Sequence, residues 1–368
     1  MAVRSRGSSS RSAATLQEEK PRTNQKADKP KTKKRKALKR LLALLLIAQV
    51  VLTLYPLPAL LVRYSEWLQK ALIFVHHVRT PFYGNLSDPS SYGLKFARQF
   101  ELFHEDKCEI EVWQVLPGAY HKERGEGDGE DLALSESEFQ TALSDGAPIV
   151  LYLHGNTGTR ALYHRVEVYK YLTQEKGAHV ITFDYRGYGN SECYPSERGM
   201  MEDALLVWNW VREHAPDSKI YVWGHSLGSA AATYLTKELC DSGNQPSGLI
   251  LDAPFTNVLD AAVNHPVSLP YWPVASLLRY YVLEAIPERF ESAQRLKDIT
   301  CPILILHGRL DIIIPFHIGE AVHKIALEFK ESHSSMGDVE FVDCGETNHK
   351  TNYLSPHTHS ALKRFLQL

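Results

Sequence analysis

The sequence predicts an α/β fold in which a mostly parallel central sheet has helices on both faces and carries a lid insertion, preceded by one transmembrane helix. Two observations lead to this prediction: an uncharged apolar run over Leu41–Val62, and strand-like apolar runs that alternate with helical patterns after Tyr92. Continuous apolar strands alternating with helices are typical of parallel sheets covered on both sides. A chain of 368 residues with 44% apolar content can bury a substantial core.

Residues 1–40 form a basic tail that we expect to be disordered and cytosolic. The tail holds 14 Lys and Arg against three acids, a net of +11 in a chain whose total is −2, which leaves −13 for the rest. With so few large apolar side chains, the tail cannot bury enough surface to offset its ordering entropy. Because the body is acidic, we expect no nucleic-acid partner, whose binding needs positive charge on the folded domain.

Residues 41–62 are predicted to be a transmembrane signal anchor. These 22 residues would extend about 33 Å as a helix, enough to cross a bilayer core. Pro56 and Pro58 are expected to end or kink the helix near its far side. A buried core helix would be amphipathic, and a cleaved signal peptide would lack the long basic lead, so both alternatives are disfavoured.

The charges around the span predict its orientation. The segment Lys31–Arg40 is strongly basic, whereas Arg63 is the only basic residue close behind the span. The positive-inside rule then places the N-terminus in the cytosol and the body on the lumenal side. Asn85 begins the only N-x-S/T sequon, and it would face the glycosylating compartment.

A juxtamembrane connector is expected over residues 63–92 and the catalytic domain over 93–368. The predicted strands of this domain are Glu109–Val115, Pro148–Leu153, His179–Phe183, Ile220–Gly224, Gly248–Asp252, Pro302–Leu306 and Val339–Val342. Helical patterns such as Met200–His214 separate the later ones. Residues 118–147 are polar and predicted to be a surface excursion. Residues 255–300 exceed the usual connection length and carry many large apolar side chains, which predicts a lid.

Ser226 is the predicted nucleophile, in Gly224-His225-Ser226-Leu227-Gly228. This G-x-S-x-G follows a strand and opens a helix of small residues, which is the context of a nucleophile elbow. An ordinary strand-to-helix turn is the alternative. A hydroxyl needs a base to become a nucleophile at neutral pH.

Asp311 and His349 are the predicted acid and base, in the chain order Ser, acid, His that this arrangement uses. Each lies on a loop after a predicted strand, so parallel strands would bring both to the same sheet edge as Ser226. Asp252 is an alternative acid. The alternative bases are His307, His317, His323, His333, His357 and His359.

The oxyanion hole is expected to use the backbone N–H groups of Leu227 and Asn156. Leu227 follows the nucleophile, and Asn156 lies in His154-Gly155-Asn156-Thr157-Gly158 after a predicted strand. Two N–H groups aimed at the developing charge are what acyl transfer requires. Thr157 is the alternative donor.

The five cysteines show no CxxC spacing, so neither a zinc site nor a disulfide framework can be derived from them. We expect most of them to be small buried apolar residues. No metal and no cofactor is expected, and no protein partner is indicated.

Several motifs together resemble the α/β-hydrolases over about 270 residues. They are His154-Gly155-Asn156, Asp184-Tyr185-Arg186-Gly187-Tyr188-Gly189, the Gly-His-Ser-Leu-Gly elbow and the placement of Asp311 and His349. With the basic tail and single N-terminal span, the chain is most similar to a membrane-anchored lipase of that superfamily. This resemblance implies an endoplasmic-reticulum enzyme with a lumenal site that hydrolyses lysophosphatidylserine and monoacylglycerol.

The predicted function is therefore hydrolysis of lipid carboxylic esters through an acyl-enzyme. The apolar insertion 255–300 beside a bilayer favours a fatty acyl substrate over small esters. Because one triad serves all acyl transfers, a depalmitoylase-like thioesterase or a peptidase is the alternative. A non-catalytic binding scaffold is the remaining alternative from a different class.

Overall fold

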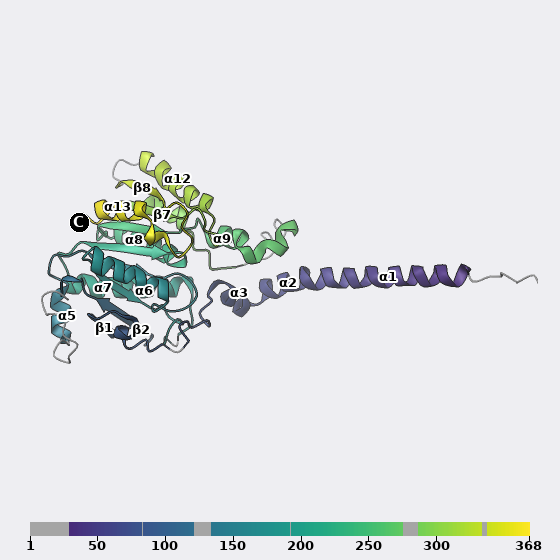
Figure 1. Cartoon of the computed structure of the whole chain (residues 1–368), viewed down its shortest axis with the longest axis horizontal. Coiled ribbons are helices and arrows are strands. Elements are labelled where there is room, and N and C mark those ends of the chain that lie inside the picture. Colours follow the sequence, from purple (N-terminus) through teal and green to yellow (C-terminus); the bar gives the residue numbers. More distant parts are fainter. Residues whose placement is uncertain (1–28, 83, 121–133, 192, 275–285, 333–336) are drawn as a thin grey trace, which may run out of the picture. The chain divides into compact units, whose positions relative to one another are not determined.

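The computed structural model describes residues 29–82, 84–120, 134–191, 193–274, 286–332 and 337–368. The chain divides into two compact units, Met1–Pro56 and Leu57–Leu368. Helix α1 (Lys29–Leu54) makes up most of the described part of the first unit, and the second unit holds the sheet (Figure 1).

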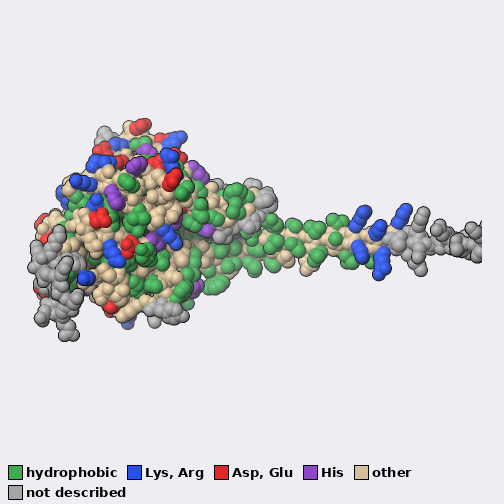
Figure 2. Space-filling model, in the orientation of Figure 1, with side chains coloured by type: hydrophobic (Ala, Val, Ile, Leu, Met, Phe, Trp, Pro, Cys, Tyr) green, Lys and Arg blue, Asp and Glu red, His purple; other side chains and the backbone are tan. Residues whose placement is uncertain are grey.

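Helix α1 is basic at its start and apolar afterwards (Figure 2). Its apolar side chains are exposed, Leu44 by 64% and Ile47 by 59%, as expected of side chains that face lipid. In the described residues, one helical stretch, Lys33–Tyr64, is long and apolar enough to cross a membrane. Pro56 begins the short helix α2 (Pro56–Tyr64) after a break at Tyr55, because proline cannot continue the hydrogen-bond ladder.

The start of α1 differs from the expected disorder of residues 1–40. Residues 1–28 lie outside the described part, but the helix begins at Lys29 rather than at the apolar run. Lys, Arg, Ala and Leu are all strong helix formers, so the apolar helix extends back through the basic segment.

The second unit contains an eight-stranded sheet of order β1-β2-β4-β3-β5-β6-β7-β8. The strands are β1 (Ala97–Phe103), β2 (Glu109–Val115), β3 (Ile149–Leu153), β4 (His179–Phe183), β5 (Ile220–His225), β6 (Gly248–Asp252), β7 (Ile303–His307) and β8 (Val339–Asp343). The β1–β2 and β2–β4 pairs are antiparallel and all others are parallel. The predicted mostly parallel sheet is confirmed.

Strand β1 is the one described strand that the sequence pattern did not predict. It lies at the sheet edge and is only partly buried, with Arg98, Gln99 and Glu101 among its seven residues. An edge strand with one solvated face needs no continuous apolar run, so its signal is weak.

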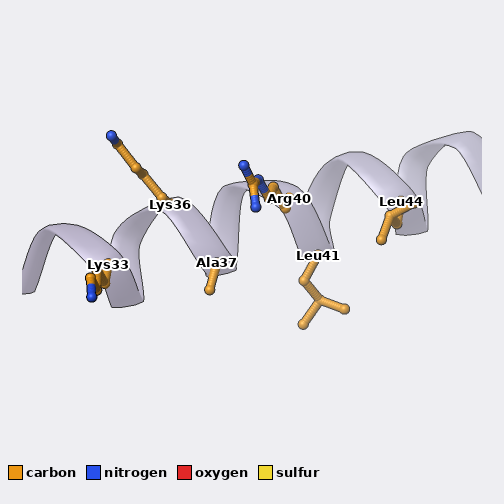
Figure 3. A pocket seen from close by; sticks show the side chains of 6 residues that line it. All are labelled: Lys33, Lys36, Ala37, Arg40, Leu41 and Leu44. Atoms are coloured by element: carbon orange, nitrogen blue, oxygen red, sulfur yellow. The ribbon is translucent and has the colours of Figure 1, made fainter. Parts of the chain in front are cut away.

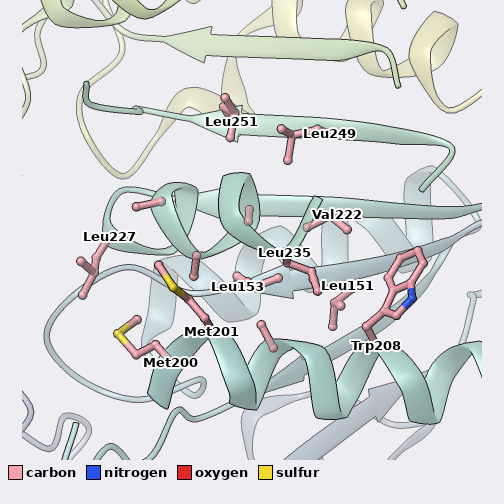
Figure 4. Close-up of a cluster of buried hydrophobic side chains, with 14 of the residues drawn as sticks. Leu151, Leu153, Met200, Met201, Trp208, Val222, Leu227, Leu235, Leu249 and Leu251 are labelled. Carbon is pink, nitrogen blue, oxygen red and sulfur yellow. The ribbon is translucent and has the colours of Figure 1, made fainter. Parts of the chain in front are cut away.

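Helices cover both faces of the sheet and bury a separate apolar cluster on each. On one face Leu151 and Leu153 pack with Trp208 and Leu235 (Figure 4), and on the other Val150 and Tyr152 pack beneath other helices. The helices on the first face are α7 (Glu197–His214), α8 (Leu227–Asp241) and α12 (Phe316–Ser332), and those on the second are α6 (Tyr163–Lys170) and α13 (Pro356–Phe365). Because the strands from β3 to β8 run parallel, their carboxyl ends lie at one edge of the sheet, between the two helix layers.

Short elements complete the described chain. They are α3 (Glu66–Ile73), η1 (Pro89–Tyr92), α5 (Glu136–Ala142), η3 (Tyr171–Glu175), α9 (Val258–Asn264), η4 (Pro266–Val274), α11 (Ser292–Arg295), η6 (Leu296–Asp298) and η7 (Asn352–Leu354). The lid predicted over 255–300 contains α9, η4, α11 and η6, and its residues 275–285 lie outside the described part. In η4, Leu269 and Trp272 are more than half exposed.

Cys108 and Cys193 form a disulfide with a Cα–Cα distance of 6.0 Å, which corrects the expectation for these two residues. They are 85 residues apart: Cys108 directly precedes β2, and Cys193 lies between β4, the antiparallel neighbour of β2, and α7. That pairing is a tertiary feature, so the spacing of the cysteines alone could not reveal it. Cys240, Cys301 and Cys344 are free thiols.

Candidate active site

Ser226 lies in a sharp turn between β5 and α8. Its φ of 53° and ψ of −120° are unusual for a residue with a side chain, and they leave it 9% exposed. The flanking glycines are required by close packing: a Cβ at Gly228 would lie 2.1 Å from the Leu153 carbonyl oxygen, and one at Gly224 would lie 2.3 Å from the Gly228 oxygen. The turn thus has the strained strand-to-helix geometry of a nucleophile elbow.

Asp311 and His349 are brought together at the carboxyl ends of β7 and β8. Asp311 Oδ2 lies 2.7 Å from His349 Nδ1, and Oδ1 accepts from the backbone N–H groups of Ile313 and Ile314 at 2.9 Å each. The carboxylate is 4% exposed, so these contacts are shielded from water. A carboxylate that accepts a hydrogen bond from Nδ1–H leaves the other ring nitrogen of His349 free to act as a base.

His349 lies beside the elbow. Its carbonyl oxygen accepts from His225 Nε2 at 2.7 Å, and the two imidazole rings have centroids 4.9 Å apart. Within the described residues, the hydrogen bonds of Ser226 all use its backbone, with its N–H donating to Asp252 O at 2.9 Å. The structure therefore brings the acid and base together and places the base next to the residue that precedes Ser226.

Asp252, the alternative acid, has a different partner. Its Oδ1 accepts from Asn352 Nδ2 at 2.8 Å, whereas Asp311 holds the His349 ring. Burial raises the pKa of Asp252 to about 7. A carboxyl that is about half protonated at neutral pH is a poorer partner for an imidazolium than a carboxylate.

The alternative bases also have other contacts. His307 is fully buried and donates to Ile314 O at 2.8 Å. His323 stacks on Phe341. His357 Nδ1 lies 2.8 Å from Asp343 O, and His359 Nε2 lies 2.8 Å from Tyr353 O. His333 lies outside the described residues, and His317 has no contact that links it to Ser226 in the described part.

The loop after β3 packs against the elbow. A Cβ at Gly155 would lie 3.1 Å from Ser226 Cβ and 2.9 Å from His225 Nδ1, so any side chain here would force these neighbours to shift. Thr157 has a φ of 65°, which is uncommon for a β-branched residue. We call residues 154–158 the oxyanion loop.

Arg165, a residue that sequence reasoning did not single out, fixes the carbonyls of this loop. Its Nη2 donates to the oxygens of Gly155, Asn156 and Thr157 at 2.7, 3.1 and 2.8 Å, and its Nη1 donates to Thr159 O at 2.6 Å. The side chain is 1% exposed and has no carboxylate within 4.0 Å among the described residues. A lone basic residue in a helix gives no sequence signal for such a role.

The hydrogen-bond partners of the backbone N–H groups favour Asn156 over Thr157 as the donor. In a planar trans peptide the C=O and the following N–H point in opposite directions. Since Gly155 O points at Arg165, the Asn156 N–H points away from it, and it has no acceptor in the described residues. The Thr157 N–H instead donates to Asn156 Oδ1 at 2.9 Å. Leu227 is the first residue of α8, where N–H groups lack partners within the helix.

A buried ion network lies behind the loop. His154 Nε2 lies 3.1 Å from Asp184 Oδ1, and Arg160 bridges Asp184 and Glu111. Burial opposes ionisation of Asp184, but Arg160 and His154 lower its pKa overall. These residues explain two of the motifs in the sequence as supports of the loop.

A hollow on α1 has no part in this arrangement. It is lined by Lys33, Lys36, Ala37, Arg40, Leu41 and Leu44, all on one helix (Figure 3). It contains no nucleophile or base, so we assign it no catalytic role.

Comparisons with known proteins agree with this description. A sequence profile described as the alpha/beta hydrolase fold matches residues 148–261. An alpha-beta hydrolase from Vibrio vulnificus has a TM-score of 0.59 at 19% identity, covering 82% of this chain and 92% of its own. An esterase from Pyrococcus furiosus has a TM-score of 0.54 at 18% identity, covering 79% and 97%. The fold is thus that of the α/β hydrolases, as predicted.

Curated relatives define the family more closely. Lysophosphatidylserine lipase ABHD12 of Danio rerio is 36% identical over 323 residues, 86% of this chain and 82% of its own. The enzyme of the same name from Rattus norvegicus is 38% identical over 329 residues, 86% and 78%. Protein ABHD12B of Homo sapiens is 33% identical over 259 residues, 69% and 68%. The chain belongs to the ABHD12 family of α/β hydrolases.

Proposed function

We propose that the protein is a serine hydrolase that cleaves the carboxylic esters of lysophosphatidylserine and monoacylglycerol. The observation that carries the proposal is the Asp311–His349 hydrogen bond beside the Ser226 elbow, in a member of a family whose relatives are named lysophosphatidylserine lipases. We assign Ser226 as nucleophile, His349 as general base and Asp311 as the residue that orients it.

The mechanism follows from these assignments. His349 takes the Ser226 proton as the oxygen attacks the ester carbonyl, and Asp311 stabilises the resulting imidazolium. The N–H groups of Leu227 and Asn156 stabilise the oxyanion. His349 then protonates the leaving alcohol, and a water molecule that it activates hydrolyses the acyl-enzyme.

Exposed apolar side chains, two of them beside Asp311, support a lipid substrate. Leu310 and Ile312, which flank Asp311, are 56% and 71% exposed, and Leu269 and Trp272 in η4 are exposed as well. Clustered exposed apolar residues mark binding surfaces for apolar partners. Because Leu310 and Ile312 are adjacent to the acid, a fatty acyl chain could contact them while its ester reaches Ser226.

Three features support an endoplasmic-reticulum membrane protein with a cytosolic N-terminus and a lumenal catalytic domain. Basic residues precede the apolar part of α1, as the positive-inside rule requires for a cytosolic start. The Cys108–Cys193 disulfide belongs to an oxidising compartment. Asn85 and Ser87 of the sequon are both exposed, so a glycan could be attached.

Labelling and hydrolysis by the full chain in membranes test the proposal. We expect a fluorophosphonate probe to label the wild type and not Ser226→Ala, and fatty acid release from lysophosphatidylserine to be lost in the same variant. Hydrolysis that survives Ser226→Ala would overturn the nucleophile. A panel of matched ester, thioester and amide substrates distinguishes the lipase from a thioesterase or peptidase, and a protein that neither labels nor hydrolyses would be a binding scaffold.

A further inference from the structure

The segment that follows α3 lies against the oxyanion loop. In the described residues Gly158 N–H donates to Val78 O at 2.9 Å, and both Thr159 N–H and Thr159 Oγ1 donate to Thr80 O at 3.1 Å. These bonds join residues about 80 positions apart. We call residues 73–80 the membrane-proximal segment, because they follow the proposed span. The sequence had suggested only a connector there.

The side chain of Asn156 makes most of the remaining contacts between the two. Its Nδ2 donates to Ile73 O at 2.5 Å, while its Oδ1 accepts from Val75 N–H at 3.0 Å and from the Tyr188 hydroxyl at 2.7 Å. The same oxygen accepts from Thr157 N–H at 2.9 Å. One amide therefore connects the two segments and also holds the left-handed backbone of Thr157.

The membrane-proximal segment is packed firmly enough to act as a support. Phe74, which lies between the two residues bonded to Asn156, is completely buried. Its ring contacts Phe290 edge-on with centroids 6.0 Å apart, and Ile73 is 7% exposed. A residue buried in the core cannot move without opening a cavity, so the carbonyl of Ile73 and the N–H of Val75 are fixed.

We propose that Asn156 is a positioning residue whose side chain fixes the oxyanion loop to the membrane-proximal segment. Arg165 fixes the carbonyls of the oxyanion loop, and the Asn156 amide bonds the loop to Ile73 and Val75, so both side chains constrain the direction of the Asn156 N–H. The membrane-proximal segment is thus part of the active-site scaffold as well as the link to the span. This inference rests on the proposed function.

Asn156→Ala tests the role because it removes the side-chain bonds and keeps the backbone N–H. With the full chain in membranes, we expect kcat for lysophosphatidylserine to fall about 10- to 100-fold, because small misplacement of an oxyanion donor has effects of that size. KM should change less than about threefold. The pH profile of kcat should keep its midpoint, because His349 and Asp311 are untouched. The fluorophosphonate labelling rate should fall with kcat.

A double-mutant cycle with Phe74→Leu separates positioning from general stability. If both residues hold the same loop, the double variant should have a kcat close to that of the slower single variant rather than the product of the two effects. The matched control is Phe139→Leu, another buried phenylalanine, in a small cluster with Phe96 and Leu116. Its effect should multiply with that of Asn156→Ala. Thermal inactivation of each variant reports folding independently.

The outcomes distinguish the two proposals. Activity in Ser226→Ala would contradict the proposed function itself. If Ser226→Ala is inactive but Asn156→Ala keeps the wild-type kcat, only the positioning role is wrong. A fall in kcat with fully multiplicative effects of Phe74→Leu would also overturn it, because the segment would then act independently of the amide.

Discussion

At the scale of single residues, the catalytic proposal depends on Asp311 and not on Asp252. Both carboxyls lie at the carboxyl edge of the sheet, but only Asp311 contacts His349. We expect Asp311→Asn to lower kcat about 10³- to 10⁴-fold by disturbing the imidazole tautomer. Asp252→Asn is the matched control and should keep kcat within a few-fold. Hydrolysis kinetics of both variants provide the measurement. A larger fall in kcat for Asp252→Asn than for Asp311→Asn would show that the acid was misassigned.

The raised pKa of Asp252 predicts a pH effect on stability. Burial keeps this carboxyl protonated in the folded protein up to about pH 7, whereas the unfolded chain releases the proton near its ordinary value of 3.8. The folded state binds more protons in this window, so the contribution of Asp252 to stability decreases as pH rises from about 4 to about 7. Asp252→Asn removes this pH-dependent contribution to stability. Its thermal midpoint relative to wild type should therefore be higher at pH 8 than at pH 5, and an equal difference at both pH values would argue against it.

The buried guanidinium of Arg165 stabilises the oxyanion loop through hydrogen bonds. This group donates to four carbonyls, and losing it would leave buried acceptors unsatisfied at a cost of about 1–3 kcal/mol each. We expect Arg165→Met to lower the free energy of unfolding by about 3 kcal/mol or more and to lower kcat. Arg212→Met is the matched control, since Arg212 also donates to backbone carbonyls, those of Pro216 and Ser218. That variant should keep kcat. Initial rates measure kcat for both variants, and thermal inactivation measures their stability.

At the scale of elements, the disulfide joins the residue before β2 to the segment between β4 and α7. It closes a long loop, so its removal should cost about 2–5 kcal/mol of stability. We expect the double variant Cys108→Ser with Cys193→Ser to inactivate at a lower temperature. The wild type should migrate faster on a non-reducing gel than after reduction, whereas Cys240→Ser should keep that difference. Free thiols at both positions in freshly isolated protein would contradict the bond.

At the scale of the whole molecule, charge and topology predict on which side of the membrane the body lies. If the catalytic domain is lumenal, Asn85 is exposed to the glycosylating machinery. We expect endoglycosidase treatment to increase the mobility of membrane-expressed protein. Asn85→Gln and Ser87→Ala should each abolish the shift, because each removes the sequon differently. A wild-type band that does not shift would count against lumenal orientation.

Much of the fold could be predicted from the sequence because burial of a strand or helix leaves a pattern of apolar residues within that element. A strand covered on both faces must be apolar throughout, so β3 to β7 were evident within a residue or so of their bounds. The elbow could be predicted because its residue pattern lies within five consecutive positions, although the close approach of Gly228 to Leu153 O that requires one of its glycines is a tertiary contact. Strand β1 was missed because an edge strand carries no such constraint.

The sequence by itself determined the class of fold, the apolar N-terminal helix and the candidate residues Ser226, Asp311 and His349, since each depends on its own neighbours or on chain order. Only the tertiary structure decided the pairing of Cys108 with Cys193, the choice between Asp311 and Asp252 as the partner of His349, and the contacts of Asn156 and Arg165 with the oxyanion loop. The physical reason is distance along the chain. Hydrogen bonds and disulfides act over a few ångströms in space, and residues that meet there can be 81 positions apart in sequence, where no periodicity or motif relates them.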